Sequence, residues 1–284
     1  MVKIIDGTKI ANGIADELKE KVALLKLNKI NPKLVIIGIS PNSRSLVYIK
    51  MKQKKAEQIG IDTEFIDIAD MSLDEQKKYV SSLSQDKSVG AIIIQLPLKG
   101  IDNPQELLDC IGRSKDVDGL SSASQKSLEA NAQGFVPATP LAVVGLLQHE
   151  GIDLNGKKVT ILGRSKLVGK PLEKILKQAG AKVMVGHSQT ADLQSLTLGV
   201  EIIISAVGKP NLVTHDMISN GSIIIDVGIT ELEGRLVGDV DFDGVKNKTS
   251  LITPVPGGVG PMTVIMLLQN VVKAYSQKSS TINK

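Results

Sequence analysis

The chain has 284 residues, long enough for two ordinary domains and too long for one small core. Apolar residues make up 42% and charged residues 23%, which excludes disordered, collagen-like and disulfide-scaffold proteins. The 34 Lys and Arg residues exceed the 30 Asp and Glu residues by four, and only six residues are aromatic, three Phe and three Tyr. This composition argues against a nucleic-acid-binding protein, which needs a dense basic face or aromatic stacking surfaces.

In the first half of the chain, short Ile and Val runs alternate with amphipathic stretches of helical length. This alternation is typical of βαβ units on a parallel sheet. The predicted order is helix, strand, helix, strand, helix, strand, over residues 8–27, 33–39, 43–59, 62–68, 73–83 and 89–95. Residues 121–135 are polar and weakly periodic, and we predict that they form a linker.

The second half repeats this rhythm after a helix that begins between Pro137 and Pro140 and extends through Leu147. We predict a strand at 157–162, a helix at 168–179, and strands at 182–185, 201–205 and 222–227. An irregular stretch rich in Pro and Gly, residues 253–263, precedes a last apolar helix that ends near Tyr275. The sequence therefore predicts two α/β halves.

The single cysteine and the lengths of the apolar runs indicate the compartment of the protein and whether it crosses a membrane. Cys110 has no cysteine partner for an internal disulfide, and we expect it to be a buried small apolar residue in a reducing compartment. No run approaches the roughly 18 apolar residues of a membrane span. We expect a cytoplasmic protein without a membrane partner.

An anion site is predicted where the strand at 157–162 breaks at Gly163. Gly163 and Gly169 would let the backbone approach a pyrophosphate, whose charge the first N–H groups of the following helix would receive. Ser165 replaces the middle glycine of G-x-G-x-x-G, so an ordinary strand-to-helix turn stays open as an alternative. The next strand is not followed by the acidic residue that holds a ribose in NAD sites, which favours NADP. Arg164, Ser188 and Lys166 could face its 2′-phosphate.

In the first half, Tyr48 and Lys52 lie four residues apart and share one face of a predicted helix. Gln95 follows a strand that can end beside them. The alternative is an ordinary solvated basic face, since three further lysines occur within residues 50–55. The three histidines show no metal spacing, and we expect no metal site.

Together, these and other motifs are similar to one family along almost the whole chain. They are Tyr48–Lys52, Gln95–Leu98, Lys115–Gly119, Pro137–Pro140, Gly163–Pro171, His187–Thr190 and Pro254–Thr263. Their order and spacing resemble the bifunctional methylenetetrahydrofolate dehydrogenase/methenyltetrahydrofolate cyclohydrolase family, and the final PGGVGPMT string is highly specific.

The resemblance implies an α/β fold of two domains with a cleft between them, and usually a homodimer. An N-terminal α/β catalytic domain for the folate, residues 1–120, would be completed by the C-terminal helix at about 262–280, which packs back on it. Residues 140–255 would form a Rossmann-like, doubly wound NADP domain. The enzyme would oxidise 5,10-methylenetetrahydrofolate with NADP and hydrolyse the methenyl product to 10-formyltetrahydrofolate.

The resemblance also implies roles for single residues. Lys52 would be the catalytic lysine, oriented by Gln95, while Tyr48 would stack on the folate and Asp118 would hydrogen-bond the pterin. Two sets of binding residues complete the site: for NADP, Gly163, Arg164, Ser165, Ser188 and Ile229, and for the folate, Pro256, Gly257 and Gly258.

Three features depart from the family pattern. The segment from Gly38 to Tyr48 is about two residues longer than usual, Ala138 stands where a cysteine is common, and residues 121–126 lack the usual Asn and Gly. The alternatives that remain are a dehydrogenase that uses NADP without hydrolysis and a folate- and NADP-binding protein without turnover.

Overall fold

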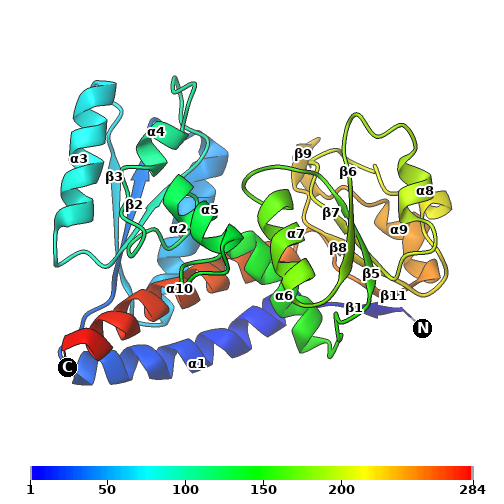
Figure 1. The fold of residues 1–284 in the computed structure, drawn as a ribbon, viewed down its shortest axis with the longest axis horizontal. Coiled ribbons are helices and arrows are strands. Elements are labelled where there is room, and N and C mark those ends of the chain that lie inside the picture. The colour runs from blue at the N-terminus through cyan, green and yellow to red at the C-terminus, as the bar shows by residue number, and fades with distance from the viewer. Residues whose placement is uncertain (1, 283–284) are drawn as a thin grey trace. The chain divides into compact units, whose positions relative to one another are not determined.

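The structure is a computed structural model that describes residues 2–282, and the chain divides into two compact units (Figure 1). The three-stranded unit contains Gly13–Ala138 and the chain from Val264 on. The six-stranded unit contains the chain up to Asn12 and Thr139–Thr263. Two long helices, α1 (Gly7–Leu27) and α10 (Val259–Ile282), continue from one unit into the other.

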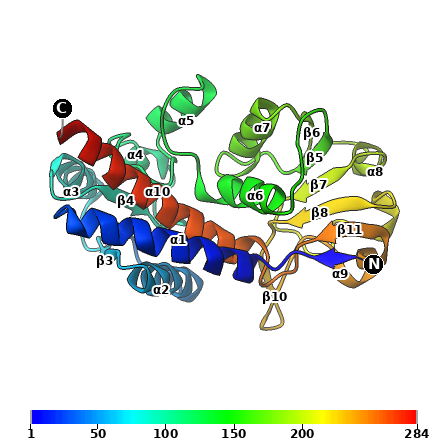
Figure 2. The same ribbon diagram turned by 90° about the horizontal axis from the view of Figure 1, so that it is seen from below.

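The three-stranded unit is built on a parallel sheet in the order β3-β2-β4. The strands are β2 (Lys33–Gly38), β3 (Asp62–Asp67) and β4 (Ala91–Ile94), connected through α2 (Ser43–Gln58) and α3 (Leu73–Gln85). The amide oxygen of Asn42 caps α2 by accepting from the Ser45 N–H at 2.8 Å, so the helix starts where the sequence predicts it. In this unit α1 and α10 run side by side (Figures 1 and 2).

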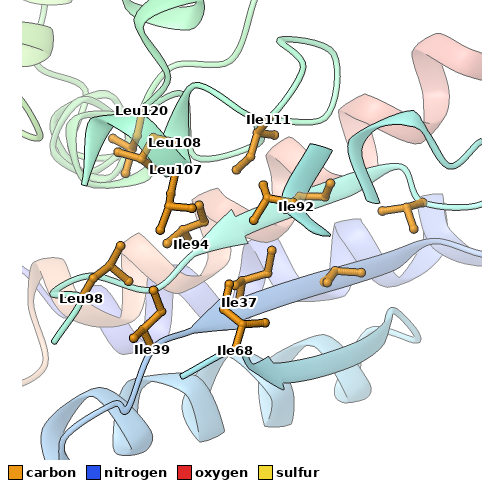
Figure 3. Close-up of a cluster of buried hydrophobic side chains, with 13 residues drawn as sticks. Ile37, Ile39, Ile68, Ile92, Ile94, Leu98, Leu107, Leu108, Ile111 and Leu120 are labelled. Carbon is orange, nitrogen blue, oxygen red and sulfur yellow. The ribbon is translucent and has the colours of Figure 1, made fainter. Parts of the chain in front are cut away.

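Branched aliphatic side chains fill one core of this unit (Figure 3). Ile37 of β2 and Ile92 of β4 are fully buried, and Leu107 of the short helix α4 (Gln105–Leu108) packs in the same cluster. Such runs suit parallel strands whose two faces are both covered. The core holds the carboxyl end of β4 in place, where Gln95 begins the next loop.

The predicted linker at 121–135 is wrong, because most of it is helical. Helix α5 spans Ser122–Glu129, and the Ser121 hydroxyl accepts from the Ser124 N–H at 3.2 Å to cap it. Ser is among the preferred residues for a helix N-cap, so this serine-rich stretch starts a helix rather than a flexible segment. The chain passes from one unit to the other at Ala138 and Thr139, the start of α6 (Ala138–His149).

The six-stranded unit has a parallel sheet in the order β1-β11-β8-β7-β5-β6. Its strands are β1 (Lys3–Ile4), β5 (Lys158–Leu162), β6 (Lys182–Gly186), β7 (Ile202–Ser205), β8 (Ser222–Asp226) and β11 (Thr249–Ile252). Its helices include α7 (Gly169–Gln178), α8 (Leu193–Thr197) and α9 (Phe242–Val245). Strand β5 lies between β6 and β7, so the order reverses beside β5, and such a switch point is where doubly wound sheets bind ligands.

Several local predictions needed correction or addition. The pairing of β1 with β11 and the hairpin of β9 (Thr230–Leu232) with β10 (Arg235–Val237) were not predicted from these short, mixed sequences. Helix α10 begins inside the Pro- and Gly-rich stretch, because Pro261 falls in its first turn, where proline is tolerated. Cys110 is half-buried rather than buried, and its thiol donates to the Glu106 carbonyl at 3.2 Å.

Residues 2–282 contain neither a candidate membrane span nor a candidate metal cluster. No helix in that range combines the length and apolar character needed to cross a membrane. Within the same residues, no three or more His, Cys, Asp or Glu side chains gather in a way that could hold a metal ion.

Candidate active site and cofactor site

Lys52 and Gln95 meet in the three-stranded unit. Lys52 lies on α2 one turn after Tyr48, and Gln95 directly follows β4. The Lys52 Nζ donates to Gln95 Oε1 at 2.8 Å, while Gln95 Nε2 donates to the Leu96 carbonyl at 2.8 Å. The second bond fixes the amide so that its oxygen faces the lysine. The structure thus separates Lys52 from the solvated lysine face that was the alternative interpretation of this helix.

Burial shifts the pKa values of Lys52 and of the nearby Asp118 in opposite directions. Loss of hydration lowers the pKa of Lys52, and the negative charge of Asp118 opposes that effect. Burial likewise raises the pKa of Asp118, against the positive charge of Lys52. Lys52 therefore offers a neutral amine at lower pH than an exposed lysine would, which is what a group that accepts a proton needs.

The turn that carries Asp118 is tied down on both sides. The buried carboxylate of Asp116 accepts from the Leu120 N–H at 3.2 Å and from the Ser121 N–H at 2.8 Å. From α10, the Asn270 amide donates to the Val117 carbonyl at 2.8 Å and to the Val136 carbonyl at 2.9 Å. These bonds fix the backbone on either side of Asp118, so its carboxyl group has a defined position relative to Lys52.

In the six-stranded unit, the turn after β5 packs its glycine backbone closely against the residue that follows β7. Gly163 has a φ of +114°, and a Cβ there would lie 2.5 Å from the Ala206 carbonyl oxygen, so only glycine fits. The Ser165 hydroxyl accepts from the Val168 N–H at 3.2 Å and from the Gly169 N–H at 3.4 Å. Ser165 thus has the acceptor role at the start of α7 that a phosphate oxygen would share.

Arg164 is drawn toward the loop after β6. Its Nη2 donates to Gln189 Oε1 at 3.0 Å, and Ser188, the residue before Gln189, is exposed in the same loop. A guanidinium and a hydroxyl on neighbouring loops suit a phosphate on the ribose of a dinucleotide. These two side chains and the start of α7 are compatible with NADP, and their binding roles stay predictions.

Two models of one protein family match this chain, one in its first part and one in its second. Residues 5–118 match the model of the tetrahydrofolate dehydrogenase/cyclohydrolase catalytic domain, and residues 137–279 match that family's NAD(P)-binding domain. The chain is 41% identical over 280 residues to the bifunctional protein FolD of Staphylococcus aureus, and the match covers 98% of each chain. The chain belongs to the tetrahydrofolate dehydrogenase/cyclohydrolase family.

Solved structures of family members share this fold. The bifunctional FolD methylenetetrahydrofolate dehydrogenase/cyclohydrolase of Campylobacter jejuni is 41% identical and superposes with a TM-score of 0.95 over 98% of this chain and 100% of its own. The Trypanosoma brucei FolD enzyme, solved with NADP and an inhibitor, is 34% identical with a TM-score of 0.92 over 98% of both chains. These likenesses confirm the predicted family, two-domain α/β fold, bifunctional enzyme class and NADP cofactor.

The remaining predicted residues of this family member lie in the six-stranded unit. Pro256, Gly257 and Gly258 form the turn before α10, where the Thr8 N–H donates to the Gly257 carbonyl at 3.1 Å. Ile229 is half-buried in the loop after β8. Their roles in binding folate and NADP stay predictions.

Four polar residues near these sites were not singled out from the sequence. Asp116 and Asn270 hold the Asp118 turn, and Asp226 and Asp239 are buried beneath the loops after β7 and β8. Asp116 falls within the Lys115–Gly119 motif, which gave it no role of its own, and Asp226 is the last residue of a strand. Asn270 and Asp239 give no signal in the sequence, because only the fold brings them to distant backbone groups.

Proposed function

We propose that this chain oxidises 5,10-methylenetetrahydrofolate to the methenyl form with NADP and hydrolyses that product to 10-formyltetrahydrofolate, with Lys52 as the residue that transfers protons in hydrolysis. The observation that carries the proposal is the Lys52 amine, whose pKa is lowered by burial and which donates a hydrogen bond to an oriented Gln95. A folate-binding protein without turnover has no need for such a group.

Hydrolysis starts with water adding to the methenyl carbon, which is bonded to two ring nitrogens that share a positive charge. The added water loses one proton to give a hydroxyl adduct. As the bond from that carbon to N5 breaks, N5 gains a proton and the hydroxyl loses its remaining proton to become the formyl oxygen. Neutral Lys52 can accept the first proton and deliver one to N5, and Gln95 holds the amine in place between these steps. The balance is one water consumed and one proton released.

Oxidation makes a different demand. The methylene carbon loses a hydride, and the lone pairs of its two nitrogens stabilise the cation that remains, so the chain need not supply a strong base. NADP supplies the hydride acceptor when bound. The residues proposed to hold NADP are Gly163, Arg164, Ser165, Ser188 and Ile229.

Folate recognition is assigned to groups around Lys52. The half-buried ring of Tyr48 offers a stacking face for the pterin or aminobenzoyl ring, and the Asp118 carboxyl can hydrogen-bond the N–H groups of the pterin. The turn at Pro256, Gly257 and Gly258 is proposed to line the folate side.

The proposal also covers the compartment, the oligomeric state and the domain limits. The single cysteine supports a reducing compartment, and we place the enzyme in the cytoplasm as a homodimer, the arrangement that the family resemblance implies. The proposed domain limits are residues 1–120 with about 262–280 for folate and 140–255 for NADP.

One assay tests the two reactions together. Purified protein is supplied with 5,10-methylenetetrahydrofolate and NADP, and the absorbances of NADPH and of the methenyl compound are followed in time. We expect NADPH to accumulate while the methenyl signal stays low. Persistent methenyl would support the dehydrogenase without hydrolysis, and no NADPH would exclude both enzymatic readings and leave a binding protein.

A further inference from the structure

Two buried carboxylates lie beneath the carboxyl ends of β7 and β8, outside the residues assigned above. Asp226 ends β8 and is 3% exposed, and Asp239, in the segment after the β9-β10 hairpin, is fully buried. Burying a carboxylate is costly unless donors surround it, so the donors show what each group holds.

Asp239 holds the loop after β7. Its Oδ2 accepts from the Ser205 hydroxyl at 2.8 Å and from the Val207 N–H at 2.7 Å, and its Oδ1 accepts from the Lys209 N–H at 2.8 Å. One side chain thus fixes both ends of the three-residue segment Val207–Lys209.

The Asp226 carboxylate accepts hydrogen bonds from the backbone at Asp239 and in the loop after β8. Its Oδ1 accepts from the Gly228 N–H and the Asp239 N–H, each at 3.0 Å, and its Oδ2 accepts from the Val240 N–H at 2.9 Å. The Thr230 hydroxyl then donates to the Gly208 carbonyl at 3.1 Å and joins the two loops at the surface. We call Val207–Lys209 with Gly228–Thr230 the loop platform.

The loop platform lies on the ligand side of the sheet. It follows the carboxyl ends of β7 and β8. The carbonyl of Ala206, the residue before the platform, faces Gly163, and the Ala206 N–H donates to the Leu162 carbonyl at 2.8 Å. Val207 is 46% exposed although it follows a fully buried strand. Since β5 and β6 with their loops form the half that receives the adenosine end, the other end of a dinucleotide falls over β7 and β8.

We infer that Asp239 is a positioning residue, seated by Asp226, that shapes the loop platform for the nicotinamide half of NADP. It does not touch the cofactor itself, but acts through the backbone of Val207–Lys209. This inference rests on the proposed function, because it takes NADP as the ligand of this unit.

Asp239→Asn is the decisive variant. An amide has one acceptor oxygen where the carboxylate has two, so at least one of the N–H groups of Val207 and Lys209 loses its acceptor or the loop shifts. Affinity for NADPH, measured by fluorescence titration without folate, should fall by about tenfold or more, as expected when a binding segment is misplaced. Affinity for adenosine 2′,5′-bisphosphate, a probe of the adenosine end alone, should change by less than about twofold.

Asp241→Asn is the matched control. Asp241 lies two residues further on, and its carboxylate caps α9 by accepting from the Gly244 N–H at 3.2 Å, with no bond to the platform. It should leave both affinities unchanged. Hydrolysis of supplied methenyltetrahydrofolate, assayed without cofactor, should be unchanged in both variants and reports that the protein is folded.

Thr230→Val gives a second route if Asp239→Asn does not fold, because it removes only the surface bond to the Gly208 carbonyl. It should weaken NADPH about threefold and leave adenosine 2′,5′-bisphosphate unaffected. Equal losses for both ligands, or no loss of NADPH affinity, would overturn the inference. A wild-type protein that binds no NADPH overturns the proposed function as well, whereas binding without oxidation overturns the dehydrogenase assignment alone.

Discussion

The two units offer chemistry by different means. Around Lys52, the functional groups are side chains removed from water, and burial shifts the pKa values of Lys52 and Asp118 in opposite directions. Around Gly163, the backbone is proposed to receive the ligand phosphates, and the side chains proposed to contact the ligand, Arg164 and Ser188, are exposed. A reaction that moves protons needs tuned side chains, whereas a site that only holds a dinucleotide can use backbone shape and surface charge.

The largest effect that this contrast predicts is for Lys52→Met. Methionine keeps the length of the side chain but cannot accept a proton, so cyclohydrolase kcat should fall by at least about 100-fold, the usual contribution of proton transfer. Dehydrogenase kcat should fall by less than about tenfold, because hydride loss needs no base. Both are measured on the same preparation, by methenyl decay and by NADPH formation.

Lys54→Met, an exposed lysine on the same helix, is the control for the lost charge and should leave both rates near wild type. If Lys52→Met removes both activities equally while folate still binds, the division of labour between the reactions is wrong.

In the other unit, Arg164→Ala should change the choice of cofactor. A hydrogen bond between charged groups contributes about 1.5–3 kcal/mol, so the KM for NADP should rise by about 10- to 100-fold. The KM for NAD, which lacks the 2′-phosphate, should change by less than about threefold. Initial rates with each cofactor at saturating folate give both values.

Lys182→Ala matches the change in net charge at the amino end of β6, away from the Ser188 loop, and should leave the cofactor preference unchanged. Equal increases in the two KM values for Arg164→Ala would place the guanidinium elsewhere than at the ribose phosphate.

Gln95→Glu tests the contrast through the pH dependence of cyclohydrolase activity. A carboxylate beside Nζ favours the ammonium form, so the pKa of Lys52 should rise and the neutral fraction at a given pH should fall. In the wild type, cyclohydrolase activity should increase with pH through a pKa below the ordinary lysine value. In Gln95→Glu this increase should occur about one pH unit higher. At a fixed pH below the pKa of Lys52, cyclohydrolase activity should therefore be about tenfold lower than in the wild type.

The dehydrogenase profile should not move with it, because hydride loss does not depend on the Lys52 charge. Gln85→Glu adds the same negative charge at the exposed end of α3 and should leave both profiles in place. A cyclohydrolase profile that stays fixed in Gln95→Glu would mean that another group titrates.

Much of the framework was predictable from the sequence, because hydrophobic periodicity is a local property. The helix that carries Tyr48 and Lys52 and the strand that ends beside Gln95 were predicted to within a few residues. The bond from Lys52 to Gln95 required the pairing of β2 with β4, and the sequence contains only the strands and not their register. Asn270 and Asp239 act on backbone groups far along the chain, so no spacing rule could find them.

The smallest effect concerns how the Asp118 turn is supported. Asn270→Ala removes the donor to the Val117 and Val136 carbonyls and leaves both without that partner, so the free energy of unfolding should fall by about 1–3 kcal/mol. Lys273→Ala removes an exposed bond from the same helix to the Gly134 carbonyl and should cost less than about 1 kcal/mol. Urea unfolding measures both.

Because Val117 adjoins Asp118, Asn270→Ala should also raise the KM for the folate by a few fold while the affinity for NADPH stays the same. A loss of stability with an unchanged folate KM would show that Asp116 alone is sufficient to hold the turn. Weakening of NADPH to the same extent would show instead that the two units respond as one, which removes the contrast between side-chain and backbone sites.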